Sequence, residues 1–299
     1  MAQFAVEEST KAKTPAPGMK LLTEQAPKSY KVNPKEILIQ CLYRPTEPIH
    51  PAIIGASYTW VDQGAGWQRI MDPFGGWVHI SRNWQSRLFL ARPEFKYLLM
   101  IDSDEAVPWW APFHLAEAMD QNDLQVLSGV VCGFTQERGL FACVAVKGGD
   151  GVARFPSLAT TKTIPTKGIQ EIHNAGTGLL MVRRDALEAL WKAWEADHAF
   201  GQPFSIPEAE QDVAALQGAL PRGEDVCFTD RCRKLGIKVN VDWAVKAGHQ
   251  KPFLMAWPEN QTTPLDPANW ARLAWPGNTL GAPVQAPPAP ISGKGRAKK

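Results

Sequence analysis

Short apolar runs alternate with helix-type patterns over most of this 299-residue chain. The most hydrophobic run, Tyr97-Leu-Leu-Met-Ile-Asp102, has the length and composition of a strand that is buried on both faces. Similar runs predict strands at residues 36–44, 124–134, 178–183 and 239–245, and amphipathic spacing predicts helices at 82–91, 112–119, 184–195 and 223–236. We therefore predict one α/β domain with a mixed, mostly parallel central sheet flanked by helices.

The two ends of the chain differ from this pattern. Residues 1–34 are rich in Lys, Pro, Thr and Glu without apolar periodicity, and residues 259–299 are rich in Pro and Ala, with four basic residues among the last six. Both should be flexible, which leaves residues 35–258 as the folded domain. A basic tail can bind a polyanion, but short charged ends also serve only to keep a protein soluble.

Composition restricts the cellular setting. No run approaches the roughly 18 uninterrupted apolar residues of a membrane span, and the N-terminus lacks the apolar core of a signal peptide. We therefore expect a cytoplasmic protein without membrane insertion, in a bacterium or in the host of a virus. The five cysteines are scattered and form no C-x-x-C pair, which argues against a disulfide framework and against a structural zinc site.

An acidic cluster, Asp102-Ser103-Asp104-Glu105, directly follows the most hydrophobic strand. In open α/β sheets, ligands bind beyond the carboxyl ends of the strands. Two carboxylates separated by one residue can direct oxygen ligands toward one divalent cation, which can bridge the phosphates of a nucleotide diphosphate. Asp and Ser are also ordinary turn residues, so an isolated D-x-D after a strand has a purely structural interpretation as well.

Three further features carry possible chemistry. Glu224 and Asp225 open a predicted helix, where acidic residues favour the helix dipole but where one carboxylate could also deprotonate a hydroxyl. His249 lies four residues beyond the last predicted strand, and an imidazole beside aspartates would favour Mn²⁺ over Mg²⁺. Gly176 and Gly178 allow a close approach of the backbone to a ligand, or simply form a tight turn.

Taken in order, these segments resemble GT-A glycosyltransferases, particularly the family-2-like group, over about residues 36–250. The matching segments are Arg82-Asn83, Asp102-Ser-Asp104, Asn174-Ala-Gly-Thr-Gly178, Gly223-Glu-Asp225-Val-x-Phe228 and Asp242 followed after six residues by His249. The resemblance implies a single GT-A, Rossmann-like domain. It also implies that Asp102, Asp104 and His249 bind the metal, and that Asp225 with Glu224 forms the catalytic acceptor site.

The resemblance further implies a donor site. The end of the first strand would seat the nucleotide, and the D-x-D segment and the glycine turn would lie against the diphosphate and the sugar. The donor-binding residues implied in this way are Leu42, Tyr43, Arg44, Arg82, Asn83, Asp102, Ser103, Gly176 and Gly178. Arg82 and Asn83 at a helix start are equally interpreted as a cap with a solvated charge. Trp109 and Trp110, next to the acidic cluster, are candidates for acceptor binding because indole faces stack on sugars and nucleobases.

These features predict a metal-dependent glycosyltransferase that moves a hexose or pentose from a nucleotide sugar, expected to be a UDP-sugar, to an acceptor hydroxyl with Mn²⁺ or Mg²⁺. The acceptor stays open between a saccharide such as a polysaccharide precursor, a protein, a small metabolite and, in a phage, a hydroxymethylated DNA base. A sugar nucleotidyltransferase would need a glycine-rich basic loop where residues 41–46 stand. A non-catalytic carbohydrate- or nucleic-acid-binding module is the alternative from another class. Residues 60–79 and 195–221 are predicted to be irregular loops.

Overall fold

The central sheet of the computed structural model follows the order β13-β12-β5-β11-β3-β1-β2. Its strands are β1 (Ile37–Tyr43), β2 (Gly66–Met71), β3 (Tyr97–Asp102), β5 (Val126–Thr135), β11 (Leu179–Arg183), β12 (Val239–Gln250) and β13 (Leu254–Met255). The structure describes residues 30–44, 49–72, 78–135, 139–147, 151, 153–157, 165, 167–207, 223–250 and 254–255.

Strand direction confirms the expected mixed sheet. β1 is parallel to β2 and β3, β12 is parallel to β5, and β11 runs antiparallel to both β3 and β5. Of the six longer strands, only β11 therefore opposes the others. The carboxyl ends of β1, β2, β3, β5 and β12 consequently lie toward one edge of the sheet, which is the edge where ligands bind in α/β domains.

Short strands extend this frame. β4 (Glu105–Ala106) and β9 (Ile169–Glu171) pair with β12, and β6 (Gly139–Ala142) pairs with β5. A separate three-stranded sheet has the order β10-β7-β8, formed by β10 (Asn174–Ala175), β7 (Val144–Lys147) and β8 (Ala153–Arg154).

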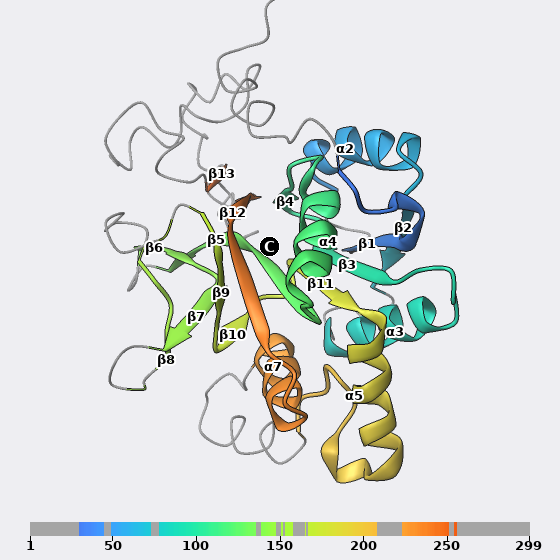
Figure 1. Cartoon of the computed structure of the whole chain (residues 1–299). Coiled ribbons are helices and arrows are strands. Elements are labelled where there is room, and N and C mark those ends of the chain that lie inside the picture. Colours follow the sequence, from blue (N-terminus) through green and yellow to red (C-terminus); the bar gives the residue numbers. More distant parts are fainter. Residues whose placement is uncertain are drawn as a thin grey trace, which may run out of the picture.

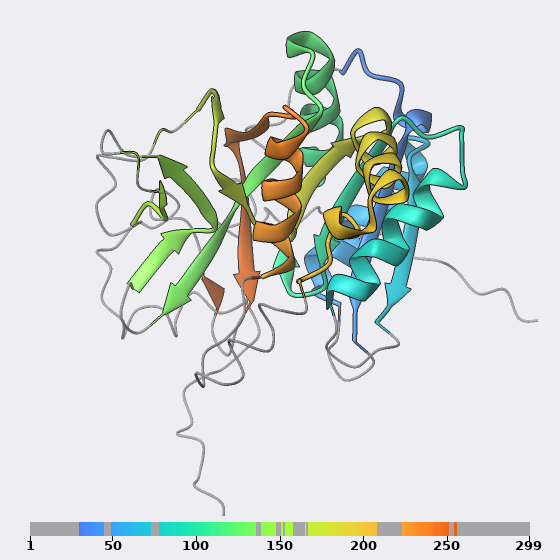
Figure 2. The same cartoon turned by 90° about the horizontal axis from the view of Figure 1, so that it is seen from below.

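Helices cover both faces of the sheet (Figures 1 and 2). They are α2 (Pro51–Asp62), α3 (Val78–Leu90), α4 (Ala111–Asn122), α5 (Arg184–Ala196) and α7 (Glu224–Lys234), with short 3₁₀ helices η1 (Pro34–Glu36) and η3 (His198–Phe200). One core cluster joins the sheet to α3, α5 and α7, and the other joins it to α2 and α4. Along β3, Leu98 and Met100 belong to the first cluster whereas Leu99 and Ile101 belong to the second, as a doubly covered strand requires.

Two expectations about element bounds are wrong. Residues 60–79 are not an irregular loop, because the segment contains the end of α2 and all of β2, with residues 73–77 outside the described part. β12 continues to Gln250 rather than ending at residue 245, so His249 lies in a strand. A shift of register between Val241 and Lys246 breaks the alternation that sequence reading depends on. Of residues 195–221, the first part completes α5 and forms η3, and 208–222 lie outside the described residues.

The chain ends fall largely outside the described residues, which exclude 1–29 and 256–299. Residues 30–34, placed by the sequence in the N-terminal segment, are described. Val32 is buried, and the Tyr30 ring lies 5.6 Å from that of Phe113 on α4. In the part of the chain that the structure describes, no helix is long and apolar enough to cross a membrane. All five cysteines are free thiols.

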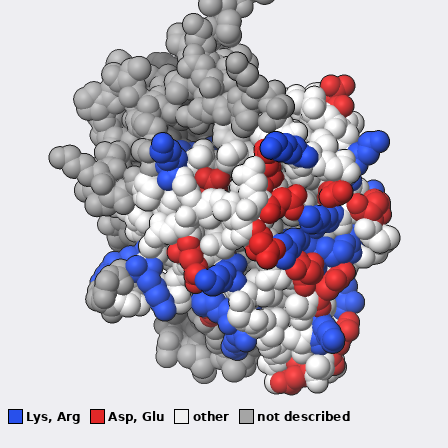
Figure 3. Space-filling model, viewed as in Figure 1, with Lys and Arg blue, Asp and Glu red and all other residues white. Residues whose placement is uncertain are grey.

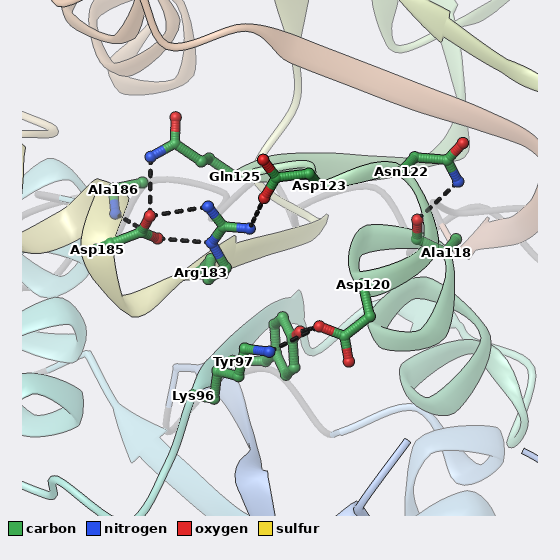
Figure 4. A network of polar contacts seen from close by, with 10 residues as sticks. All are labelled: Lys96, Tyr97, Ala118, Asp120, Asn122, Asp123, Gln125, Arg183, Asp185 and Ala186. Carbon is green, nitrogen blue, oxygen red and sulfur yellow. Dashed lines mark hydrogen bonds and ion pairs between the residues drawn. The ribbon is translucent and has the colours of Figure 1, made fainter. Parts of the chain in front are cut away.

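A polar network fastens the edge of the sheet where β3 begins (Figure 4). Arg183, at the end of β11, donates to Asp185 and Asp123 at 2.8 Å each. Tyr97 donates its hydroxyl to Asp120 on α4. This network lies at the opposite end of β3 from Asp102 and therefore stabilises the scaffold rather than the ligand-binding edge.

Candidate active site

Four segments that are distant in sequence meet at the carboxyl edge of the sheet. Asp102 ends β3 and is opposite Leu42, near the end of β1. The backbone N–H of Asp102 donates to the carbonyl of Gly178, just before β11, over 3.3 Å. β4 pairs with β12 so that Glu105 is opposite His249. The D-x-D segment is thus fixed by strand pairing on both sides.

Asp104 and His249 form a close polar pair. The distance between Asp104 Oδ2 and His249 Nε2 is 3.1 Å, and the other ring nitrogen, Nδ1, lies 2.9 Å from the carbonyl oxygen of Cys132. A carbonyl can only accept, so Nδ1 carries a proton and donates it. In a neutral imidazole, the lone pair of Nε2 then faces a carboxylate oxygen, which is also an acceptor.

Two facing acceptors are stabilised either by a proton or by a cation that both atoms bind. The donor set of one carboxylate and one imidazole fits a divalent cation that shares its remaining positions with substrate phosphates and water, as Mg²⁺ sites commonly do. Among the described residues, no group of three or more His, Cys, Asp and Glu side chains is placed to hold a metal. The fit is therefore to a cation site that a phosphate ligand completes.

Asp102 has a different partner and does not complete a three-ligand group with this pair among the described residues. Its Oδ1 accepts a hydrogen bond from Arg82 Nη2, and Arg82 is fully buried on α3 whereas the Asp102 side chain is 38% exposed. Arg82 Nη1 also donates to Gln85 Oε1 over 2.9 Å. The sequence grouped Asp102 with the metal ligands and Arg82 with the donor contacts. The structure places the two side chains against each other.

Glu105 lies beside the candidate site, although the sequence analysis did not select it as a site residue. It is 2% exposed, and its Oε1 would lie 1.9 Å from a Cβ at position 178, whereas Asp102 Oδ2 would lie 3.1 Å from the same point. Gly178 therefore has to lack a side chain so that two carboxylates can approach its backbone. Gly176 has more room, since its nearest neighbour would be the Cys143 carbonyl at 3.4 Å.

Asp225 and Glu224 begin α7, as the sequence predicts. Thr177 donates its hydroxyl to Glu224 Oε1 over 3.2 Å, which connects the helix to the glycine turn. The pKa of Asp225 is raised to about 6, mainly by burial. The negative charges of Glu224 and, less strongly, of Asp102 contribute to this rise, whereas hydrogen bonds from backbone N–H groups oppose it. Asp225 is thus a carboxylate whose proton affinity is tuned toward neutral pH.

The end of β1 forms the other side of the site. Leu42 is buried, whereas Tyr43 and Arg44 are partly exposed. Asp72, just after β2, donates its backbone N–H to the Tyr43 carbonyl over 2.8 Å, and its side chain lies 3.8 Å from Arg44 Nε. Ser81 donates to the same carboxylate over 2.6 Å. Sequence reasoning missed Asp72 because it follows a strand that was not predicted.

Ser103 is buried, and its carbonyl accepts the backbone N–H of His50 over 2.7 Å. His50 in turn caps α2 by accepting the N–H of Ala52 on Nδ1 over 3.0 Å. Burial lowers the pKa of His50, and the charge of Asp104 acts in the opposite direction. His50 therefore anchors the loop that contains Asp104 to the start of α2, although no sequence motif includes this histidine.

The remaining candidates from the sequence, Asn83, Trp109 and Trp110, are buried or partly buried. Asn83 accepts the backbone N–H of Phe204 over 3.0 Å and donates to Ser205 over 3.2 Å, so its amide holds the segment after η3. Trp110 is 3% exposed and packs in the core. Trp109 is only partly buried, and its carbonyl accepts the indole N–H of Trp60 over 2.6 Å. Of the tryptophan pair, Trp109 is the one with accessible surface.

No family model matches the sequence, and no curated protein matches it. Among solved structures, the chain is similar to A197 from STIV, with a TM-score of 0.48 and 16% identity over 76% of this chain and 92% of that one. It is also similar to GalNAc-T7 with UDP, GalNAc and Mn²⁺, with a TM-score of 0.42 and 10% identity over 71% of this chain and 43% of that one.

A third similar structure is a glycosyltransferase involved in the glycosylation of the major capsid of PBCV-1, with a TM-score of 0.33 and 15% identity over 59% of this chain and 73% of that one. Glycosyltransferases are the class that the sequence resembles. Because each identity is below 25% and each TM-score is below 0.5, we rest the function on the residues of this chain.

Proposed function

We propose that this protein is a metal-dependent glycosyltransferase that moves a sugar from a nucleotide-diphosphate donor to an acceptor hydroxyl. The observation that carries the proposal is the pair of acceptor atoms, Asp104 Oδ2 and His249 Nε2, that face each other at 3.1 Å on the carboxyl edge of the sheet. A cation with the diphosphate of a donor sugar is the ligand combination that suits this pair.

Asp104 and His249 would hold a Mn²⁺ or Mg²⁺ ion, which when bound supplies the positive charge that stabilises a leaving nucleoside diphosphate. Cys132 fixes the imidazole through its carbonyl, which keeps Nε2 directed at the site. Gly178 lets Asp102 and Glu105 approach the backbone where the sugar would lie. Asp104, His249 and Cys132 would thus position the cation, and Gly178 would leave space for the sugar.

Asp225 is the proposed general base. With a pKa of about 6, its carboxylate is largely ionised at pH 7 yet basic enough to accept a proton from an acceptor hydroxyl as the glycosidic bond forms. Glu224 supports it by adding negative charge nearby. This role belongs to an inverting reaction. In a retaining reaction, Asp225 would orient the acceptor by accepting a hydrogen bond from it.

The finer choices are a UDP-sugar as donor and Mn²⁺ as metal, because a carboxylate-imidazole pair favours manganese. For the acceptor we retain a saccharide, a protein and a hydroxymethylated DNA base. On the face shown in Figure 3, Lys and Arg side chains are interspersed with Asp and Glu. That face offers no broad single-sign surface to favour one of these acceptors.

The test is the release of nucleoside diphosphate from UDP-, GDP- and dTDP-sugars, with and without Mn²⁺. Wild-type protein should release one nucleotide in a metal-dependent way, and Asp104→Asn should abolish the release. Asp230→Asn, on the same helix as Asp225, is the control and should leave release unchanged. Absence of metal-dependent binding of every donor by calorimetry would refute the proposal. Acceptors are then added singly as oligosaccharide, peptide or hydroxymethylated single-stranded DNA.

A further inference from the structure

Among the arginines that are largely or fully buried, Arg82, Arg184 and Arg231 differ in what they contact. Arg184 donates to four backbone carbonyls that end α3 and precede β3, among them that of Phe95 at 2.8 Å. Arg231 donates to the carbonyls of Phe200 and Pro203 at 2.8 and 3.3 Å. These two side chains fasten loops to helices. Arg82, in contrast, donates to no backbone carbonyl among the residues that the structure describes.

The partners of Arg82 are the carboxylate of Asp102 and the amide of Gln85, and its buried Nε has no hydrogen-bond partner in the described structure. The Nε2 of Gln85 is buried and likewise unpartnered. Burying a guanidinium costs free energy that one ion pair does not always repay. A partly satisfied buried network is a poor device for stability. The placement of Arg82 is therefore better explained by what it does to Asp102.

We propose that Arg82 is a positioning residue that keeps Asp102 out of the cation site, so that Asp104 and His249 alone hold the divalent ion. This inference deepens the proposed function and rests on it for the consequence in catalysis. Arg82 occupies Oδ1 of Asp102 and offsets its negative charge, while His249 faces Asp104. The two aspartates of one D-x-D segment thus have different partners and different tasks.

The remaining oxygen shows what Asp102 is left to do. Asp102 Oδ2 would lie 3.1 Å from a Cβ at position 178, and the Asp102 side chain as a whole is 38% exposed. With Oδ1 held by Arg82, Oδ2 can accept a hydrogen bond from a hydroxyl of the donor without drawing the cation away from Asp104. A carboxylate that is neutralised by a buried guanidinium is a weaker cation ligand than one beside an imidazole lone pair.

Manganese binding without any donor tests this division. We expect Arg82→Met to bind Mn²⁺ several-fold more tightly than wild type, because it frees Asp102 as a further ligand and removes a positive charge. Adding Asp102→Asn to Arg82→Met should return the affinity to the wild-type value. In the wild-type background, Asp102→Asn should change Mn²⁺ affinity by less than about twofold, whereas Asp104→Asn should lower it at least about tenfold.

Weaker Mn²⁺ binding by Arg82→Met, or equal losses for Asp102→Asn and Asp104→Asn, would overturn the inference. Arg184→Met is the matched control, since it removes a largely buried guanidinium whose hydrogen bonds go to backbone carbonyls and whose nearby carboxylate, Glu188 at 3.7 Å, lies on its own helix. It should lower the melting temperature without tightening Mn²⁺ binding. If Arg82→Met does not fold, the Mn²⁺ affinities of Asp102→Asn and Asp104→Asn, compared with that of wild type, test the inference. If the variants show the expected Mn²⁺ affinities but no donor releases its nucleotide, the proposed transferase activity is refuted. The different roles of Asp102 and Asp104 in cation binding would still hold. No Mn²⁺ binding by wild type would refute both.

Discussion

Asp104 Oδ2 and His249 Nε2 lie 3.1 Å apart although 145 residues separate them in sequence. Their contact depends on the pairing of β4 with β12, which places Glu105 opposite His249. The carbonyl of Cys132 fixes the imidazole from the other side. The candidate metal pair is therefore a product of sheet topology and not of a local motif.

His249→Ala should lower the affinity for Mn²⁺ at least about tenfold, because it removes one of two protein ligands. The matched control is His114→Ala. His114 Nε2, on α4, also lies close to a carboxylate oxygen, 2.9 Å from Asp242 Oδ2, which does not belong to the D-x-D segment. Calorimetry or manganese spectroscopy on both variants measures the difference. An equal loss for the two variants would contradict the site.

Asp225 should set the acid limb of the activity profile. We expect kcat/KM to rise with pH through about 6 and then level, since the base must be ionised. Asp225→Asn should reduce kcat by about 100- to 10,000-fold and remove that limb. Asp230→Asn should retain both, because Asp230 lies five residues further along α7 and pairs with Arg233. A limb that persists in Asp225→Asn would assign the base elsewhere.

The same carboxyl should affect stability with a defined sign. Its pKa is raised from 3.8 to about 6 in the folded state, so protonation favours folding. That contribution is fully present below about pH 4 and is lost as pH rises through about 6, with a range of about 1–3 kcal/mol. The free energy of unfolding of Asp225→Asn, relative to that of wild type, should therefore be larger at pH 7 than at pH 4. Denaturant melts of both proteins at the two pH values measure this difference. A difference that is the same at pH 4 and pH 7 would argue against a raised pKa.

The sequence predicts the parts of this site that depend on local pattern. The bounds of β3, the acidic cluster at its end and the acidic start of α7 all follow from apolar runs and helix rules, and they match the structure. Contacts made by long-range pairing do not follow from such patterns. His249 was expected in a loop because the register shift after Val241 hides the end of β12. Asp72 was missed because β2, the last strand on the sheet path, lacks a continuous apolar run.

Arg82 shows a second limit of sequence reading. A charged residue on a helix is expected to face solvent, yet this guanidinium is fully buried. The neighbouring Ser81, Gln85 and Ser86 are buried as well, so α3 presents a polar face to the protein interior. Only the tertiary structure shows that this face lies beneath Asp102.

Gly178→Ala should reduce kcat/KM by about 100-fold while the fold is kept. The added Cβ would lie 1.9 Å from Glu105 Oε1 and 3.1 Å from Asp102 Oδ2, so the buried Glu105 carboxylate must move, and a displacement of about 1 Å at a reacting centre has this effect. Gly55→Ala is the control. It lies in α2 with open space around its Cα, and it should raise stability by about 0.5–1 kcal/mol without changing kinetics. If kcat/KM is the same for Gly178→Ala and Gly55→Ala, Gly178 is not part of the active site.

Arg183→Ala should separate scaffold stability from activity. Arg183 donates two hydrogen bonds to Asp185 and one to Asp123 at the far end of β3 from Asp102, so its removal should lower the melting temperature and leave donor binding unchanged (Figure 4). The hydrogen bonds from Arg183 hold the pKa of Asp185 below its usual value. The stability that this pair adds is present above the unfolded-state pKa of about 3.9 and is lost as pH falls through the lower folded value. The penalty of Arg183→Ala should therefore shrink between pH 7 and pH 3 in parallel denaturant melts. A penalty that stays constant over this range would show that Arg183 acts by packing and not by charge.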